Sequence, residues 1–284
     1  MRRVVAALTG AAATAVVLRA WSARSRSPVA TDEPAGSSWQ RTNYRGRTVS
    51  LSGGLAAAAG ACTAVAVAGG TWRTGAAGAL ATAGAGLLGL VDDHAPDPGA
   101  ARGLRGHLRA LTHGEVTTGT MKLLGIPALS LAAAAMLEPT RRSSAPLRRG
   151  LDVLCSGALI AGTANLVNLF DLRPGRALKV TGVLSAPLLL TPGPSGRVAA
   201  GACGVLAASW ADDLGERTML GDTGANALGA MAGTALALLP SAAVRAGALA
   251  GVVTLIAASE KVSFSAVIDR VAVLRTVDRW GRRP

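Results

Sequence analysis

The sequence predicts an all-α, polytopic integral membrane protein with about nine transmembrane helices and a C-terminal amphipathic helix. Half of the 284 residues are hydrophobic, and they come in runs of about the length that crosses a bilayer, roughly 17–25 residues. The runs 52–71 and 242–259 carry at most one charge and have no polar face, which argues against the alternative of a soluble, Ala-rich helical protein. The many small residues in these runs suit close helix packing in lipid.

The chain is predicted to form a single membrane domain, 1–284. Residues 1–20 resemble a first transmembrane span or a signal anchor, because a basic start precedes an apolar run. Residues 21–51 are polar and are predicted to form a cytoplasmic loop before the transmembrane core 52–259. In the cytoplasmic tail, 260–284, apolar residues at helical spacing alternate with basic ones, which is typical of an amphipathic helix on a membrane surface. The predicted spans cover residues 4–20, 52–71, 75–91, 122–137, 150–170, 178–192, 196–211, 224–240 and 242–259.

Charge predicts the orientation and the kind of partner. Alternating the nine spans puts 20 of the 29 Lys and Arg on one face, so the positive-inside rule makes that face cytoplasmic and places the N-terminus outside. The same face holds 14 of the 16 acidic residues. The net charge of +13 lies in loops between spans, which favours anionic lipid headgroups and a phosphorylated substrate over nucleic acid. The Arg pairs near residues 2, 141 and 148 oppose this orientation, and cleavage of the first span would invert it.

The segment from Asn165 to Gly175 carries the most informative motif. Asn165 and Asn168 are three residues apart, so a helix places both carboxamides on one face. Asp171 follows where the apolar run stops, and Pro174 ends the helix just beyond it. Polar groups at the end of a membrane helix are costly to place there without a use. Three basic residues follow within eight positions, and phosphoryl transfer uses this mixture of a metal-binding carboxylate with cations for phosphate.

A second acidic site is predicted at Asp92 and Asp93, at the end of the run 75–91. Adjacent carboxylates repel, so one of them should have a raised pKa unless a cation lies between them. Mg²⁺ suits this position because it often takes one or two carboxylates together with substrate phosphates. A solvated acidic loop is the plain alternative. Lys122 opens the next span, where the helix dipole disfavours a cation, so we expect an anionic partner for it; snorkelling to the interface is the common alternative.

A third site is predicted at Gly221-Asp222-Thr223-Gly224, which leads into the eighth span. Its glycines would let the backbone approach a substrate while Asp222 binds a hydroxyl group or a metal; a helix cap made by Asp222 or Thr223 is the structural alternative. The nearby acids Asp212, Asp213 and Glu216 are expected to be exposed and without a role.

Two arginines, Arg45 and Arg47, precede a glycine pair at the start of the second span. Arginines beside a Gly-rich helix start can receive a phosphate. Ordinary basic residues at a membrane edge are the competing interpretation, and this stretch alone favours it.

Together these motifs resemble the polyprenyl-phosphate sugar-1-phosphate transferases, which include the phospho-MurNAc-pentapeptide and phospho-GlcNAc transferases. The resemblance covers roughly residues 40–265. The family has an Asp-Asp pair after a transmembrane helix, an Asn-x-x-Asn-x-x-Asp-Gly-x-Asp-Gly segment and a Gly-Asp-Thr-Gly segment. The matching residues are Asp92, Asp93, Asn165, Asn168, Asp171, Gly175 and Gly221 to Gly224, with Lys122 matching a lysine soon after the Asp-Asp loop.

The resemblance implies an Mg²⁺-dependent phosphoglycosyl transferase of the cytoplasmic membrane face. In such enzymes a polyprenyl phosphate attacks a UDP-sugar, UMP leaves, and a lipid-linked sugar pyrophosphate forms for cell-envelope polysaccharide or peptidoglycan synthesis. It implies Asp171 as the first metal ligand, and Asp92 or Asp93 as a metal ligand or proton acceptor. It implies substrate binding by Lys122, Asn165, Asn168 and Asp222. Association into a homo-oligomer is left open.

The chain departs from the family pattern at the second aspartate of the Asp-Gly-x-Asp-Gly segment, which is Pro174 here, and at its first glycine, which is Leu172. The histidine-rich motif of the muramyl branch is also missing, since the only histidines are His94, His107 and His113. A muramyl-pentapeptide substrate is therefore not expected. The departures leave two alternatives: an enzyme with a changed substrate, or a non-catalytic protein that binds polyprenyl-phosphate intermediates or scaffolds envelope enzymes. A transporter ranks last, because the acids lie at helix ends and not at mid-span.

Overall fold

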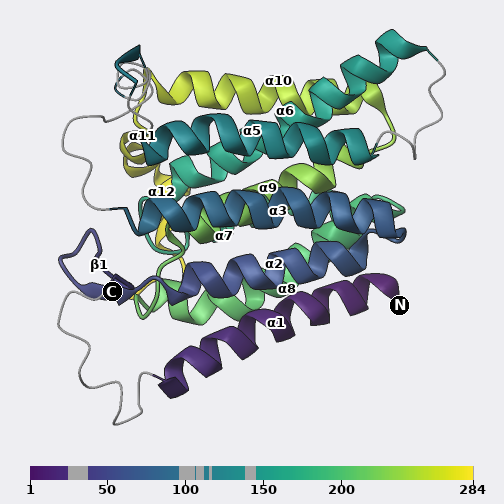
Figure 1. Cartoon of the computed structure of the whole chain (residues 1–284). Helices are drawn as coiled ribbons and strands as arrows, with labels where there is room; N and C mark the ends of the chain where they lie inside the picture. The colour runs from purple at the N-terminus through teal and green to yellow at the C-terminus, as the bar shows by residue number, and fades with distance from the viewer. Residues whose placement is uncertain (25–37, 96–105, 107–111, 115–116, 138–144, 284) are drawn as a thin grey trace.

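The computed structural model describes all residues except 25–37, 96–105, 107–111, 115–116, 138–144 and 284. Much of the expected loops 21–51 and 92–122, with His107 and the arginines at 141 and 142, therefore lies outside the described residues. Figure 1 shows long helices packed side by side, with the N-terminus at one end of the helices and the C-terminus at the other. The elements are α1 (Arg2–Arg24), β1 (Gln40–Thr42), β2 (Thr48–Ser50), α2 (Ser52–Ala68), α3 (Trp72–Asp93), α5 (Thr118–Leu137), α6 (Pro146–Phe170), α7 (Arg176–Ser185), η3 (Pro187–Leu190), α8 (Pro194–Leu214), α9 (Gly221–Ala237), α10 (Ala242–Ser259), α11 (Phe264–Arg270) and α12 (Ala272–Arg279).

Five of the described helices are long and apolar enough to cross a membrane: α1, α3, α5, α6 and α10. The apolar helix α2 is shorter, with 17 residues. The all-α prediction is confirmed for the body of the molecule, and these five helices indicate a membrane-associated protein. The number of nine spans stays a prediction.

The helix α9 lies at the centre of the molecule, in contact with α2, α3, α6 and α8. Nearly all of its residues are buried. Two glycines one helical turn apart allow this, since a Cβ on Gly229 would lie 2.5 Å from the carbonyl oxygen of Thr163, and a Cβ on Gly233 would lie 2.7 Å from Cα of Ile160. The small residues noted in the sequence therefore bring α9 into backbone contact with α6, as small residues do between membrane helices.

Adding one methyl group at these contacts should destabilise the protein. We expect Gly229→Ala and Gly233→Ala each to cost about 1–3 kcal/mol, because the new Cβ overlaps backbone atoms that cannot move freely. The melting temperature in detergent measures this. Gly251→Ala is the matched control, since no atom lies within 4 Å of its Cβ position in α10. Equal melting temperatures for Gly229→Ala and Gly251→Ala would contradict the packing described here.

The stretch 178–192, predicted as one span, is not a single helix. Helix α7 has 10 residues, about 15 Å in length, and it gives way to the short 3₁₀ helix η3 at Pro187, which has no N–H to continue an α-helix. Arg3 at the start of α1 donates to the carbonyl oxygens of Leu189 and Thr191, both at 2.6 Å. The broken segment therefore reaches the end of the molecule at which α1 begins.

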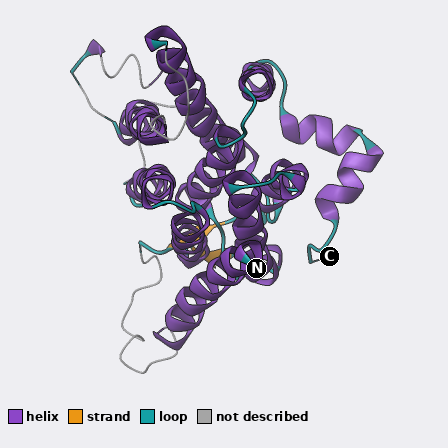
Figure 2. Ribbon diagram, turned by 90° about the vertical axis from the view of Figure 1, so that its right-hand side faces the viewer, coloured by secondary structure: helices purple, strands orange, loops and turns teal. Residues whose placement is uncertain are grey.

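Two other expectations about the ends of the chain need correction. The predicted loop before the second span contains a hairpin, in which β1 and β2 pair antiparallel with Arg41 opposite Val49. The predicted C-terminal amphipathic helix is two helices, α11 and α12, because Val271 between them is extended. Figure 2, which looks from the end where α1 begins, shows these short helices beside the bundle.

Candidate functional site

Four chain segments bring acidic side chains together, and a fifth adds a lysine, at the end of the molecule where α3, α6 and α8 end and where α5 and α9 begin (Figure 1). We call this the acidic end. It contains the three predicted sites, contributed by the end of α3, the end of α6 and the start of α9. Its described carboxylates and lysine are Asp92, Asp93, Asp171, Asp213, Asp222 and Lys122.

Asp93 caps the central helix. Its Oδ1 accepts a hydrogen bond from the backbone N–H of Asp222 at 3.0 Å, and its Oδ2 accepts from the backbone N–H of Thr223 at 2.9 Å and from the Thr223 hydroxyl at 2.6 Å. The first N–H groups of a helix have no partner within the helix, so a carboxylate satisfies them well. The cap expected from Asp222 or Thr223 is thus supplied by Asp93 from another helix, and both Asp93 oxygens are engaged.

Lys122 joins Asp92 of the second predicted site to Asp222 of the third. Its ammonium nitrogen lies 2.5 Å from Oδ2 of Asp92 and also contacts Oδ2 of Asp222. These two charges offset the unfavourable position of a cation at a helix start. The anionic partner that the sequence predicts for Lys122 is therefore present within the protein, and about a fifth of the lysine side chain (18%) is exposed.

Asp171 lies directly after the last residue of α6. Burial of its carboxyl group raises its pKa well above the ordinary value, and the nearby carboxylates of Asp213, Asp222 and Asp93 raise it further, while a backbone hydrogen bond from Gly221 opposes the shift. The residue as a whole still has intermediate exposure. The structure thus holds several carboxylates close to Asp171 with too little positive charge to balance them.

Asp213 and Glu216 were expected to be exposed, and this expectation is wrong. Asp213 is 4% exposed and Glu216 is 7% exposed. Oδ2 of Asp213 accepts a hydrogen bond from the backbone N–H of Gly175 at 2.6 Å, which ties the end of α8 to the loop that follows Asp171. Asp212-Asp213 ends an apolar run just as Asp92-Asp93 does, so the same sequence signal could have identified Asp213.

Arg45 and Arg47 lie on the hairpin turn and face Glu216. Their guanidinium nitrogens are 3.4 and 3.7 Å from the Glu216 carboxylate, and the side-chain amide of Asn43 donates to it at 2.8 Å. A parallel bridge between Ser50 and Thr218 fixes the hairpin beside the same loop. Any phosphate bound by these arginines would compete with Glu216.

Within the described residues, the side chains of Asn165 and Asn168 make no hydrogen bond to the acidic end. Asn165 is exposed and Asn168 is of intermediate exposure. Only the backbone carbonyl of Asn168 takes part, accepting from the N–H of Asp171 at 3.0 Å. The predicted role of these carboxamides in substrate binding stays a prediction.

The carboxylate oxygens of the acidic end are the kind of ligand that a hard cation such as Mg²⁺ prefers. Among the described residues there is no group of three or more His, Cys, Asp or Glu side chains arranged to hold a metal ion. Mg²⁺ does not need one, because it is commonly held by one or two carboxylates with waters and substrate phosphates. Asp171 is the carboxylate best suited to bind Mg²⁺, because both carboxylate oxygens of Asp93 already accept hydrogen bonds from the start of α9.

The C-terminal tail lies against the loop that carries Asp171. The buried Asp278 accepts from Nε of Arg176 at 2.8 Å, and Nε of Arg282 donates to the carbonyl oxygen of Pro174 at 2.7 Å. Lys179 donates to the carbonyl oxygens of Asp278 and Trp280 at 2.6 and 2.8 Å. Arg176 and Lys179, two of the basic residues that follow the Asn165–Gly175 motif, therefore hold the tail in place. The sequence did not indicate this contact.

Comparison with known proteins adds no further assignment. No protein-family model matches this chain, and no curated protein matches it. The resemblance described above therefore rests on its short motifs.

Proposed function

We propose that this protein is an Mg²⁺-dependent phosphoglycosyl transferase. It would transfer a sugar-1-phosphate from a UDP-sugar to a polyprenyl phosphate at the cytoplasmic membrane face, releasing UMP, in the synthesis of cell-envelope polysaccharide or peptidoglycan precursors. The observation that carries the proposal is the meeting of Asp93, Asp171 and Asp222, from three distant motifs, with Lys122 at one end of a bundle of apolar helices.

The chemistry explains why such a site suits a membrane surface. An oxygen of the lipid phosphate forms a bond to the β-phosphorus of the UDP-sugar, and the bond from that phosphorus to the oxygen of UMP breaks, with UMP taking the electron pair. The acceptor's hydrocarbon tail stays in the bilayer while its phosphate reaches the ends of the helices. Both reactants are anions, so the site has to supply positive charge.

The residues at the acidic end can divide this work. Asp171 would hold Mg²⁺, which when bound stabilises negative charge on the pyrophosphate group. Asp92 or Asp93 would accept the proton of the lipid phosphate, and in the unliganded site Asp92 pairs with Lys122 while Asp93 is hydrogen-bonded to the start of α9. Lys122 lies between two carboxylates and can turn its exposed ammonium group to a phosphate oxygen.

A nine-span topology with the acidic end in the cytoplasm accompanies this proposal. Support comes from the helix order, since α1, α3 and α6 begin at the end opposite the acidic end and α2 and α5 run the other way. The broken pair α7 and η3 would count as one crossing. The positive-inside rule then orients the molecule.

A second candidate is a non-catalytic protein that binds polyprenyl-phosphate intermediates. Pro174 favours it, because proline replaces an acidic residue of the resembled family and its carbonyl oxygen is bonded to Arg282 of the tail. In this case the acidic end would bind a lipid phosphate through a cation without turnover.

Release of UMP by the purified protein tests the first candidate. UDP-GlcNAc and other UDP-sugars would be supplied with and without polyprenyl phosphate and with and without Mg²⁺. We expect release with one donor only when both lipid and metal are present. Folded protein that binds the lipid but releases no UMP from any donor would overturn the catalytic proposal and favour the second candidate.

A further inference from the structure

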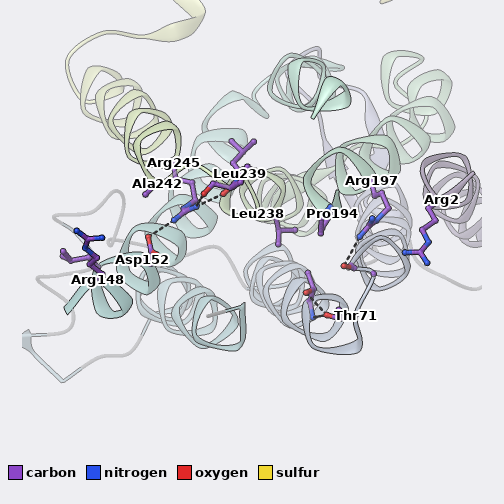
Figure 3. Close-up of a pocket in the computed structure, with 15 residues that line it drawn as sticks. Arg2, Thr71, Arg148, Asp152, Pro194, Arg197, Leu238, Leu239, Ala242 and Arg245 are labelled. Carbon is purple, nitrogen blue, oxygen red and sulfur yellow. Dashed lines mark hydrogen bonds and ion pairs between the residues drawn. The ribbon is translucent and has the colours of Figure 1, made fainter. Parts of the chain in front are cut away.

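The end of the molecule opposite the acidic end contains a cavity of about 910 Å³. It lies among the starts of α3, α6, α8 and α10 and the ends of α2 and α9 (Figure 3). Four arginines and one aspartate line it, which gives its charged residues a net charge of +3 at neutral pH. These are Arg2, Arg148, Arg197, Arg245 and Asp152.

Two of the arginines are fixed in the wall. Arg245 is 3% exposed and donates to Oδ1 of Asp152 at 2.7 Å and to the carbonyl oxygen of Leu239 at 2.6 Å. Its buried Nε has no hydrogen-bond partner among the residues that the structure describes. Arg197 donates to the carbonyl oxygens of Ala68 and Gly69 at 2.7 and 3.2 Å, at the end of α2. Asp152 is the one carboxylate on the described wall, so only one of the four positive charges is matched.

The other two arginines are available to a ligand. Arg2 and Arg148 are exposed, and within the described parts of the chain neither has an ion-pair partner. They approach the cavity from opposite sides, Arg2 beside Arg197 and Arg148 beside Asp152 (Figure 3). Arg2 also repels Arg197, and positive charge without a carboxylate partner favours binding of an anion at the cavity.

The helix starts add to this preference. The first turns of α6, α8 and α10 supply Arg148, Arg197 and Arg245, and Thr71 and Thr74 come from the start of α3. The N-terminus of a helix carries a partial positive charge and attracts anions. The four helix starts and the four arginines therefore both favour binding of an anion in this cavity.

We propose that this cavity binds a phosphate group, and that the ligand is the headgroup of an anionic phospholipid in the leaflet opposite the acidic end. Its position fits, because ends of membrane helices lie at headgroup depth. Apolar side chains such as Leu151 and Leu238 share the wall with the arginines, which suits a ligand with a polar head and an apolar body. The site also gives a role to arginines that oppose the positive-inside rule.

Lipid binding by the full-length protein tests the proposal. Protein in nanodiscs or detergent would be titrated with phosphatidylglycerol, phosphatidylcholine and inorganic phosphate, with bound lipid measured by native mass spectrometry. Arg2→Gln and Arg148→Gln remove the two exposed cations without disturbing the wall. Arg73→Gln is the matched control, because Arg73 is exposed and packs over the ring of Trp72 outside the cavity.

We expect phosphatidylglycerol to bind more tightly than phosphatidylcholine and each cavity variant to weaken it about five-fold, the typical contribution of one basic residue at a charged membrane surface. The Arg73→Gln protein should bind as the wild type does. If millimolar inorganic phosphate saturates the cavity and the protein shows no preference for lipid, the cavity binds phosphate but its ligand is soluble. That result would overturn the assignment of a lipid headgroup. Equal binding of the two lipids, or equal loss in Arg73→Gln and the cavity variants, would overturn the proposal.

Discussion

An Asp171→Asn protein is expected to be more stable than the wild type in metal-free buffer, and increasingly so as the pH rises from 5 to 8. Burial and the carboxylates of Asp213, Asp222 and Asp93 raise the pKa of Asp171 well above its ordinary value. The folded state therefore keeps a proton that the unfolded state loses above its pKa of about 3.9, so the free energy of unfolding falls with rising pH. A carboxamide has no charge to bury and removes the part of that dependence that comes from residue 171.

Melting temperatures across this pH range, with and without Mg²⁺, measure the effect. The wild-type melting temperature should fall with rising pH and recover when Mg²⁺ neutralises the cluster. The variant should respond less to both, and its remaining pH dependence should come from Asp213 and Asp222, whose pKa values burial raises to about 6. Asp269→Asn is the control, because this aspartate is about half exposed (48%) and pairs with Arg173 only at 3.8 Å. A wild type and an Asp171→Asn variant with the same pH dependence and the same response to Mg²⁺ would argue against a cation site at Asp171.

Replacing Asp278 by alanine should destabilise the protein by about 3–5 kcal/mol, the usual cost of leaving a buried charge without its partner. The carboxylate of Asp278 binds Arg176 through two hydrogen bonds, at 2.8 and 3.2 Å, and binds Arg282 at 2.5 Å. The side chains of Arg176 and Asp278 are only 3% and 6% exposed. Without the carboxylate, Arg176 and Arg282 repel each other without a shared partner, and the tail loses its anchor.

Chemical or thermal unfolding, together with limited proteolysis of the tail, measures this prediction. Asp278→Ala should lower the melting temperature and expose the segment after α11 to protease. Asp269→Ala, in the same tail but with an exposed, long ion pair, should change stability by less than about 1 kcal/mol. If both variants lose the same stability, the buried pair does not anchor the tail.

The sequence indicated the helices and their ends more accurately than the contacts between them. Apolar runs fixed most helix positions because burial in a membrane or core demands them along the whole helix. The exceptions have local causes. Pro187 interrupts α7 within an apolar stretch, and the pairing of β1 with β2 depends on contacts with the loop at Thr218 that no local pattern contains.

The candidate site was predicted in part because its acidic residues lie at the ends of helices that the apolar runs predict. Helix ends carry Asp92, Asp93, Asp171 and Asp222, and alternation of helix direction brings helix ends together. Burial of Asp213 and Glu216 depends instead on contacts of the end of α8 and of the loop after it with Gly175 and with the hairpin, so position in the sequence alone wrongly predicted that they are exposed. The different contacts of Asp92 and Asp93 could not be predicted from the sequence either. They became clear only from the structure, in which Asp93 accepts hydrogen bonds from the start of α9 and Asp92 pairs with Lys122.

The rate of UMP release by wild-type and Asp171→Asn proteins, compared at saturating Mg²⁺, polyprenyl phosphate and UDP-sugar, tests the central claim most directly. Loss of the carboxylate that would hold the metal should lower the rate by about 10³ or more, because metal stabilisation of the transferring phosphate contributes several kcal/mol. The melting temperature of the Asp171→Asn protein in metal-free buffer, which should be higher than that of the wild type, checks that the variant is folded. A well-folded Asp171→Asn protein that releases UMP as fast as the wild type would contradict the assignment of the acidic end as the catalytic site.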